Sequence, residues 1–456
     1  MKLTIIGGGG VRAPYMIAGL VRYAPRIDLQ EVWLMDIDAE KLDLIGRLCQ
    51  HLARRLHAPF TLHLSTDARE ALAGADHVIT TLRVGGELGR VKDERVALRR
   101  GVIGQETTGA GGFAMAMRSI PAIRGYCELM DKVAPRAWLY NFTNPAGLVT
   151  QALRDAGHPR VIGICDSANG AQHAVARFLG IPNHQVQIEV FGLNHLSWTR
   201  CALVDGEDQL ARLIQDPAFV HSSYLRLFDA ALINRLKMYL NEYLHYYYYR
   251  DEALAALQAK QETRGEEVLR LNAALLDLLR NTPDPDKALD IHQAIMSERS
   301  STYMAHAKSN SAPAPAERPR AKDASEDDAA DHGYAGVALA CVEAIRSGKP
   351  HRTGLNVPNE GAIAGMRDDD VVEITCIVDA AGPHPLPIGD VPEHPYLLMR
   401  QVKRYERLAA EAILTRDRAL AVEALFEHPL VGSYSLATAL VDDYLDAHRE
   451  YVGEWR

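Results

Sequence analysis

The sequence predicts an α/β fold: an N-terminal Rossmann-like, doubly wound parallel sheet, followed by a mostly helical α+β C-terminal domain. Over the first 200 residues, short runs rich in β-branched residues alternate with longer stretches that carry apolar residues at helical spacing. Such alternation is typical of a parallel sheet covered by helices. Beyond about residue 207, long helical patterns dominate. With 456 residues, the chain exceeds the usual size of one compact core, so we expect two closely packed domains.

The predicted strands of the first domain are seven short apolar runs. They read LTIIG, VWLMD, FTLHLS, HVITTL, AWLYNF, RVIGI and QIEVF. Helical patterns lie between them, for example AEKLDLIGRLCQHLARRL, in which apolar residues recur every three or four positions. We place this Rossmann-like domain at residues 1–196.

The second predicted domain comprises residues 197–456 and is mostly helical. Its helices include SYLRLFDAALINRLKMYLNEYL and GEEVLRLNAALLDLLR, and helices return from about Tyr396 onward. TGLNVPN and VVEITCIVDAAG are two strand-like runs between them. Residues 307–332 are rich in Ala, Pro and mixed charge, which bury too little apolar surface to become ordered alone, so we predict a mobile loop there.

The composition excludes several classes of partner. A net charge of -9 leaves no excess of Lys and Arg to neutralise phosphates, so we expect no nucleic-acid partner. The sequence contains no run of about 18 apolar residues, so we expect no membrane span. The apolar stretch before the glycines of MKLTIIGGGG is too short to form the apolar core of a signal peptide. Six cysteines without CxxC spacing favour reduced thiols, and therefore a cytoplasmic protein.

A glycine-rich segment, LTIIGGGGVRAPYMIAGL, lies between a predicted strand and a predicted helix. Gly8, Gly10 and Ala13 match the GxGxxA fingerprint of dinucleotide-binding folds, in which the helix N-terminus faces the pyrophosphate. Asp36 ends the next strand, where a carboxylate accepts from a ribose 2′-hydroxyl and favours NAD over NADP. The predicted cofactor contacts come from six residues: Gly8, Gly9, Gly10, Val11, Arg12 and Asp36.

Polar clusters follow the later strands, where a doubly wound sheet forms its ligand crevice: GVIGQETTGAGGF, NFTNPAG, GICDSANG and FGLNHLSW. Asn144 and Asn194 offer both donors and acceptors to sugar hydroxyls. Cys165 and His195 together suit a borderline metal such as Mn²⁺, Fe²⁺, Co²⁺, Ni²⁺ or Zn²⁺. From composition alone, a buried thiol and a hydrogen-bonded core histidine are the alternative.

These motifs, with TIIGGGG and NEYLHYY, occur in an order and spacing that resembles glycoside hydrolase family 4. Its members are NAD- and metal-dependent 6-phosphoglycosidases and their relatives, and the resemblance covers nearly the whole chain. It implies NAD as cofactor and Cys165 and His195 as the two protein ligands of a divalent metal, for which we expect Mn²⁺.

The resemblance also implies a reaction, because the handful of glycosidases that depend on NAD depart from the two-carboxylate scheme. C3 of the sugar is oxidised, the C2 proton is removed, the aglycone is eliminated, water adds, and C3 is reduced again by the same cofactor. A metal chelated by the C2 and C3 oxygens acts as a Lewis acid. Tyr243 is the implied base, and a phenol can act so only if a nearby cation lowers its pKa. We expect Tyr246, Tyr247, Tyr248 and Tyr249 mostly to pack.

Asp166 directly follows the cysteine ligand. In α-selective members of the family, an aspartate here looks like the acid for the leaving group, whereas β-selective members usually carry asparagine. IGQETTG, in contrast, looks like the β-selective members. We expect β-linked 6-phospho-glucosides, with Asp166 as a catalytic candidate or, alternatively, as a substrate acceptor or a partner of the ligands.

A 6-phosphate needs cationic contacts. Arg264 matches an arginine that looks like a phosphate ligand in relatives, and a planar guanidinium suits bidentate binding. Arg90 and Arg95 are further candidates, or else part of a solvated helical charge run. Where relatives often read GGGS, this chain has Gly10, Val11 and Arg12, which leaves a uronate or sulfonate glycoside open.

We therefore expect a cytoplasmic glycosidase that acts on a small phosphorylated glycoside and forms a homodimer or homotetramer. An α-linked or other anionic glycoside is the alternative substrate. An NAD-dependent hydroxy-acid dehydrogenase on the same fold would need no metal-binding cysteine and would form NADH. A non-catalytic redox sensor would bind NAD without any dependence on metal.

Overall fold

The computed structural model describes residues 1–304, 307 and 335–456. The mobile loop predicted over residues 307–332 lies outside the described residues, apart from Ala307. Within the described ranges, no helix combines the length and the apolar character that a membrane crossing requires.

A sheet of nine strands forms the centre of the molecule, in the order β13-β12-β11-β6-β5-β4-β1-β2-β3. Its parallel part consists of β1 (Lys2–Ile6), β2 (Glu31–Met35), β3 (Thr61–Ser65), β4 (His77–Thr80), β5 (Trp138–Asn141) and β6 (Val161–Gly163). The spatial order 3-2-1-4-5-6 is that of a doubly wound dinucleotide-binding sheet. The predicted fold class is confirmed. The order reverses between β1 and β4, which places the ligand crevice beyond their carboxyl ends.

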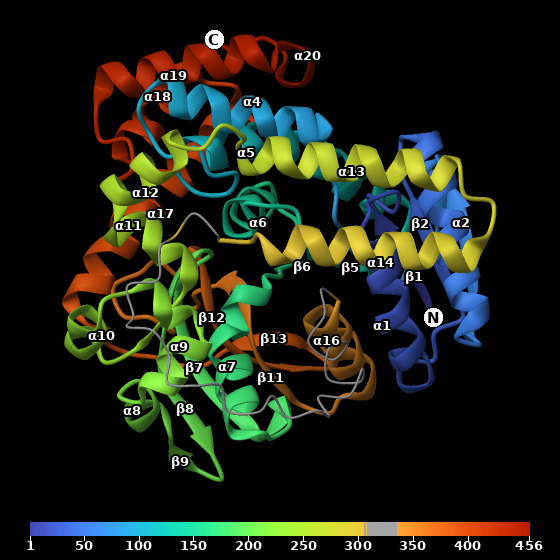
Figure 1. Ribbon diagram of the computed structural model, residues 1–456, viewed down its shortest axis with the longest axis horizontal. Helices are drawn as coiled ribbons and strands as arrows, with labels where there is room; N and C mark the ends of the chain where they lie inside the picture. The colour runs from blue at the N-terminus through green and yellow to red at the C-terminus, as the bar shows by residue number, and fades with distance from the viewer. Residues whose placement is uncertain (305–306, 308–334) are drawn as a thin grey trace.

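Helices cover both faces of this sheet (Figure 1). One layer contains α1 (Ala13–Ile27), α2 (Ala39–Arg55) and α16 (Gly336–Ser347), and the other contains α3 (Ala68–Leu72), α5 (Gly109–Val133) and α6 (Ala146–Asp155). The two layers follow from right-handed crossovers that start in opposite directions from β1 and β4. α4 (Gly86–Arg99) and α7 (Gly170–Leu179) begin after β4 and β6, so both start on the ligand side.

Three antiparallel strands from the second half of the chain extend the sheet. They are β11 (His351–Pro358), β12 (Val371–Asp379) and β13 (Gly382–Pro385). β11 pairs with β6 at Asn356 and Gly163, so one sheet combines both halves of the chain. The domain division at residues 196 and 197 stays a prediction of the sequence.

A smaller antiparallel sheet stands beside the large one. It contains β7 (Val186–Leu193), β8 (Leu196–Val204), β9 (Glu207–Asp208) and β10 (Tyr239–Leu240). The run QIEVF therefore forms a strand, but not one of the parallel sheet. Because Leu193 pairs with Leu196, only Asn194 and His195 make the turn between β7 and β8.

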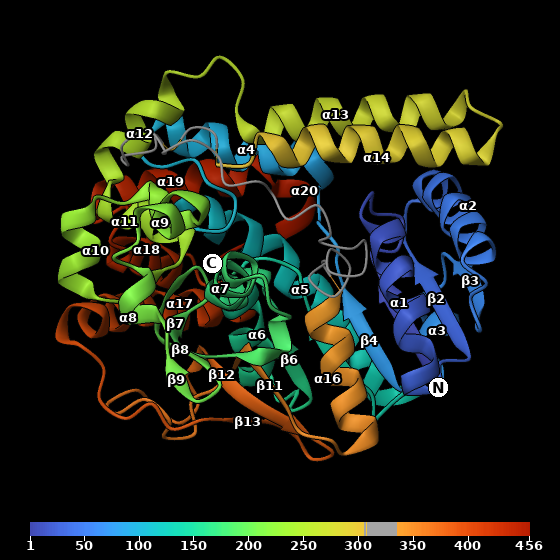
Figure 2. The same cartoon turned by 60° about the horizontal axis from the view of Figure 1, so that its bottom comes forward.

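The rest of the second half is helical. Short helices come first: α8 (Leu210–Leu213), α9 (Pro217–Ser222), α10 (Ala230–Leu236), α11 (His245–Tyr248) and α12 (Arg250–Gln258), with the 3₁₀ turns η3 (Tyr224–Leu227) and η4 (Glu242–Leu244). The longer ones are α13 (Arg264–Arg280), α14 (Pro285–Ser301), α17 (Glu393–Thr415), α18 (Arg418–Glu427) and α19 (Tyr434–Ala447), followed by α20 (Arg449–Val452). Figures 1 and 2 both show α13 and α14 side by side, reaching across to α2 in the first half.

Candidate functional site

The glycine-rich loop after β1 is held by backbone hydrogen bonds that require small residues. The amides of Gly7 and Gly8 both donate to the carbonyl of Met35, at 2.9 Å each. A Cβ atom on Gly8 would lie 2.7 Å from the Cβ of Leu34, so the loop tolerates no side chain there. The loop then leads directly into α1, whose N-terminus is the kind of site that binds a pyrophosphate.

Asp36 fixes this loop from the end of β2. Its Oδ2 accepts from the amide of Gly9 at 3.0 Å, and its Oδ1 accepts from the amide of Asp38 at 3.1 Å. Ile37 beside it is 79% exposed, which is unusual for isoleucine. From α14, the Nε2 atom of His292 lies 2.7 Å from the carbonyl of Val11. This crowded glycine cradle, followed by a carboxylate, fits a bound dinucleotide.

Cys165 and His195 lie in contact. The Sγ atom of Cys165, just beyond β6, is 3.3 Å from the Nε2 atom of His195 in the β7–β8 turn. His195 has a positive φ of 65°, which is uncommon for a residue other than glycine. The sequence-predicted metal ligands are therefore brought together.

Thr107 orients the imidazole of His195. Both the amide and the hydroxyl of Thr107 donate to Oε1 of Gln105, at 2.7 and 2.9 Å. The hydroxyl has one proton, so it accepts from Nδ1 of His195, which lies 2.9 Å away. The free lone pair is then on Nε2, which faces Cys165, as metal-binding histidines require. Sequence analysis missed Thr107, although it lies within the quoted motif GVIGQETTGAGGF.

Burial favours the neutral forms of His195 and Cys165 when no metal is bound. It lowers the pKa of His195 to about 3, so the imidazole stays neutral and able to bind a metal. Burial, with Glu373 nearby, raises the pKa of the Cys165 thiol, so a metal ion would have to displace its proton. In the described part of the chain, no three His, Cys, Asp or Glu side chains gather as a metal site. This pair thus fits a metal that keeps positions open for substrate oxygens.

Tyr243 covers the imidazole. Its ring stacks on that of His195, with ring centroids 3.7 Å apart and an angle of 12° between the planes. Burial and the adjacent Glu242 raise the pKa of Tyr243 well above its ordinary value, and its hydroxyl is hydrogen-bonded to Tyr303. The phenol can therefore act as a base only with a cation beside it. Sequence analysis did not single out Tyr303.

One cavity of about 650 Å³ brings most of the predicted site residues together. Its lining includes Arg12, Arg90, Asn144, Cys165, Asp166, His195, Tyr243 and Arg264. Burial raises the pKa of Asp166, against the opposing effect of Arg12. A carboxyl group of this kind holds its proton more readily than an exposed one, as a leaving-group acid must.

Asn194 is not among the residues that line this cavity. Its Nδ2 donates to Oε2 of the buried Glu373 at 3.1 Å, and its Oδ1 accepts from the amide of Gly147 at 3.4 Å. Direct contact with a sugar hydroxyl, as the sequence suggested for Asn194, is not supported by this position.

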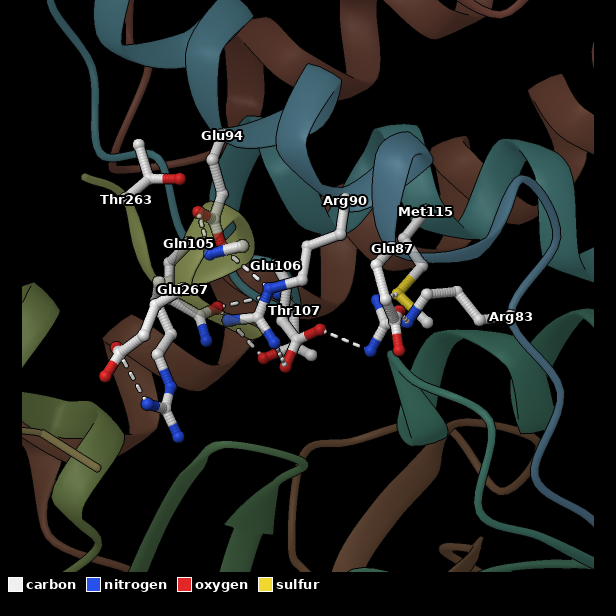
Figure 3. Close-up of polar contacts among 12 residues, drawn as sticks. Arg83, Glu87, Arg90, Glu94, Gln105, Glu106, Thr107, Met115, Thr263 and Glu267 are labelled. Atoms are coloured by element: carbon white, nitrogen blue, oxygen red, sulfur yellow. Dashed lines mark hydrogen bonds and ion pairs between the residues drawn. The ribbon is translucent and has the colours of Figure 1, made fainter. Parts of the chain in front are cut away.

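Arginines and glutamates form a connected cluster on one side of the cavity (Figure 3). Nε of the buried Arg90 donates to Glu94 at 2.8 Å, and its NH1 lies 3.0 Å from Oε1 of Glu106. NH2 of Arg83 lies 2.6 Å from Oε2 of Glu106. Although burial opposes ionisation, Arg83 and Arg90 hold the pKa of Glu106 at about 2. Sequence analysis did not single out Arg83 or Glu106.

Arg264 stands at the start of α13, which begins with a capping box formed by Thr263 and Glu266. Its NH1 donates to Oε2 of Glu267 at 2.9 Å, and its NH2 donates to the carbonyl of Arg299. Arg95 is bonded to Glu266 instead and is not part of the cavity lining, which matches the alternative of a surface charge run.

The cavity favours an anionic ligand. Among the described residues, its lining contains six arginines and one lysine but only four carboxyl groups. The cations that sequence analysis did not consider are Arg177, Arg226, Lys260 and Arg299. They come from α7, η3, α12–α13 and α14, so no single motif indicates them.

Comparison with known proteins places these features in one family. The model described as Family 4 glycosyl hydrolase matches residues 2–181, and the model of the C-terminal domain of that family matches residues 190–431. The chain is 32% identical, over 469 residues, to a protein named Probable 6-phospho-beta-glucosidase from Bacillus subtilis strain 168. The match covers 100% of this chain and 98% of that protein.

Solved structures agree over the full length. The 6-phospho-beta-glucosidase of Thermotoga maritima, solved with manganese, NAD⁺ and glucose-6-phosphate, has a TM-score of 0.82 and 28% identity, and the match covers 99% of both chains. A 6-phospho-alpha-glucosidase from gut microorganisms, solved with NAD and Mn²⁺, also has a TM-score of 0.82, with 25% identity and coverage of 100% of this chain and 99% of that one. Both anomeric specificities therefore occur on this fold.

Proposed function

The chain belongs to family 4 of the glycosyl hydrolases, and from this premise we propose that it hydrolyses 6-phospho-glucosides, with β-linked ones favoured, using NAD⁺ and a divalent metal ion. The observation that carries the proposal is the contact between Cys165 and His195 in a cavity that also contains Tyr243. Mn²⁺ is the metal we expect, and it is present with NAD⁺ in the similar Thermotoga maritima enzyme.

The glycine loop and Asp36 hold the cofactor. Backbone amides between Gly8 and Arg12 bind the pyrophosphate at the start of α1, and Asp36 binds the ribose and disfavours a 2′-phosphate. Cys165 and His195 hold the metal. When bound, NAD⁺ supplies reversible acceptance of hydride from C3, and the metal supplies Lewis acidity at the sugar oxygens.

Tyr243 accepts the C2 proton at its hydroxyl oxygen. Its ring lies against that of His195, and a cation bound by His195 would favour the phenolate. The hydrogen bond with Tyr303 orients the hydroxyl. Asp166 holds a proton for the departing aglycone oxygen, and Asn144 binds hydroxyl groups of the sugar.

Arg90 and Arg264 bind the phosphate, with the other cations of the lining. Both guanidinium groups are already oriented by carboxylates, Arg90 by Glu94 and Arg264 by Glu267, so little side-chain freedom is lost when the substrate binds. The presence of glucose-6-phosphate in the similar Thermotoga maritima structure supports a phosphorylated substrate.

An α-linked substrate is the second candidate, and Asp166 is the observation that favours it. Aspartate follows the cysteine ligand here, as in the α-selective pattern, and Asp166 lines the cavity. The similarity to a 6-phospho-alpha-glucosidase supports the same alternative.

We also propose that the enzyme works in the cytoplasm as a homodimer or homotetramer. All six cysteines are unpaired, which suits a reducing compartment. The oligomer is an inference from the family, and light scattering of the purified protein tests it.

A panel of nitrophenyl glycosides tests the function. The 6-phosphorylated β-glucoside should be cleaved only when NAD⁺ and Mn²⁺ are both present, and its unphosphorylated counterpart far more slowly. Faster cleavage of the phosphorylated α-glucoside would reverse the anomeric assignment. Preference for a glucuronide or a sulfonated glycoside would show that the anionic group of the substrate is not a phosphate. Cleavage by protein stripped of NAD⁺ and metal, or net NADH formation without cleavage, would contradict the proposal.

A further inference from the structure

Glu373 is a fully buried carboxyl group on β12 that accepts three hydrogen bonds from neutral side chains. The hydroxyl of Ser197 donates to Oε1 at 2.7 Å. The amides of Asn194 and Asn356 donate to Oε2 at 3.1 and 3.3 Å. A group with this many donors is built to accept hydrogen bonds as an anion.

Two of these donors flank the proposed metal ligand. Asn194 and His195 form the two-residue turn between β7 and β8, and Ser197 follows two positions later. Glu373 therefore fixes both sides of the turn that holds His195 at a positive φ. Oδ1 of Asn194 also accepts from the amide of Gly147, so the turn is tied to the segment that carries Asn144.

The same carboxyl group reaches the tyrosine turn through one further residue. Nδ2 of Asn241 donates to the hydroxyl of Ser197 at 3.1 Å, and the amide of Asn241 donates to the carbonyl of Ser197 at 3.2 Å. Oδ1 of Asn241 accepts from the amide of Tyr243 at 3.0 Å and thereby caps η4. Glu373 thus links the segments that carry His195 and Tyr243.

The causes that set the pKa of Glu373 include no cation from the described residues. In residues 1–304 and 335–456, no arginine, lysine or histidine forms an ion pair with it. Burial raises its pKa to about 7. Glu373 also lies close enough to Cys165 to oppose ionisation of the thiol. Two buried anions this close are costly unless a cation accompanies them.

We propose that Glu373 is a positioning residue for the His195 turn and the buried counter-charge of the metal that Cys165 and His195 hold. This inference rests on the proposed function, because it requires the metal. A divalent cation, the Cys165 thiolate and the Glu373 carboxylate together carry no net charge, which is the arrangement that a buried site tolerates best.

Binding of Mn²⁺ to the Glu373→Gln variant tests the inference, with Mn²⁺ affinity measured by calorimetry and NAD⁺ affinity measured alongside. Glutamine keeps the shape but not the charge, so Mn²⁺ affinity should fall by about 10- to 100-fold, the usual effect of removing an outer-shell partner of a ligand. NAD⁺ affinity should stay unchanged. With Co²⁺, the absorption band from thiolate ligation should require a higher metal concentration in this variant than in the wild type.

Thr375→Val is the matched control. Thr375 lies two residues further along β12, is equally buried, and bonds to the backbone of Ile188 and Val190 on β7, but not to the β7–β8 turn. Its Mn²⁺ affinity should match that of the wild type. Should Glu373→Gln fail to fold, Ser197→Ala removes the shortest bond to the carboxylate and should still weaken Mn²⁺ binding several-fold.

Unchanged Mn²⁺ affinity in Glu373→Gln, or an equal loss in Thr375→Val, would overturn the role of Glu373. Wild-type protein that fails to bind Mn²⁺ would instead contradict the proposed function, and the inference with it. The two failures are therefore distinguishable.

Discussion

The Sγ atom of Cys165 lies 3.3 Å from the Nε2 atom of His195, although the two residues are 30 positions apart. Cys165 follows a strand of the parallel sheet, whereas His195 belongs to the turn of an antiparallel hairpin. Their contact joins the two sheets at the cavity, beside the ring of Tyr243. The contact therefore lies where a doubly wound sheet forms its ligand crevice.

Cys165→Ser should abolish Mn²⁺-supported turnover while NAD⁺ binding stays intact. A serine hydroxyl is a much weaker ligand for a borderline metal than a thiolate, and the loss of a ligand should exceed the ~100-fold effect typical of outer-shell changes. Titration with Mn²⁺ under turnover, together with NAD⁺ binding by fluorescence, measures both effects. Full activity in this variant would remove the metal assignment.

Tyr243→Phe should lower kcat by about 10²- to 10⁴-fold, the usual contribution of general acid–base catalysis, with little change in substrate binding. Tyr248→Phe is the matched control, because Tyr248 belongs to the same aromatic stretch but bonds to Trp198 and does not line the cavity. If both variants lose activity equally, the stretch has a packing role and Tyr243 is not the base.

Arg264→Gln should reduce kcat/KM for the phosphorylated substrate by about 10- to 100-fold, because a charge-assisted hydrogen bond to the phosphate is lost. Cleavage of the unphosphorylated glycoside should not change. Arg270→Gln is the control, since Arg270 lies on the same helix and pairs with Glu262 at the surface. An equal loss on both substrates would contradict a phosphate contact.

Glu242 should make the metal-free protein less stable as the pH rises. Burial raises its pKa from 4.5 to about 7, so the folded protein binds this proton more tightly than the unfolded chain does. Its contribution is complete below about pH 4.5 and is lost as the pH rises to about 7. The Tm of the wild type should therefore fall more steeply over this range than that of Glu242→Gln. Parallel Tm profiles would contradict the assignment.

Much of the fold was predictable because the pattern of strands and helices is local. Each run from LTIIG to RVIGI forms its own strand of the parallel sheet. Strand partners are not local, however. QIEVF forms β7 in the smaller sheet, and β11 pairs with β6 although nearly 200 residues separate Gly163 from Asn356. Periodicity cannot indicate which sheet a strand joins.

Prediction of the site was limited in the same way, because local motifs do not show which distant residues come into contact. Cys165 and His195 were proposed from their residue types in polar loops that follow strands. The family resemblance then favoured the metal interpretation and indicated Tyr243. Asn194 was given a substrate role because its amide lies in a polar cluster and offers both donors and acceptors to sugar hydroxyls. In a tight turn, however, neighbouring side chains point to different sides, and that of Asn194 points toward Glu373. Thr107 and Glu373 act through contacts with distant residues, which no spacing within one segment reveals.

Proton exchange at C2 tests the central claim most directly. The 6-phosphorylated nitrophenyl glucoside should be hydrolysed in D₂O with NAD⁺, Mn²⁺ and a reductant, and the sugar product examined by NMR. Removal of the C2 proton by Tyr243 predicts deuterium at C2, together with loss of turnover when NAD⁺ or metal is omitted. Cleavage without deuterium at C2 would contradict the oxidation–elimination route and indicate ordinary acid–base hydrolysis instead.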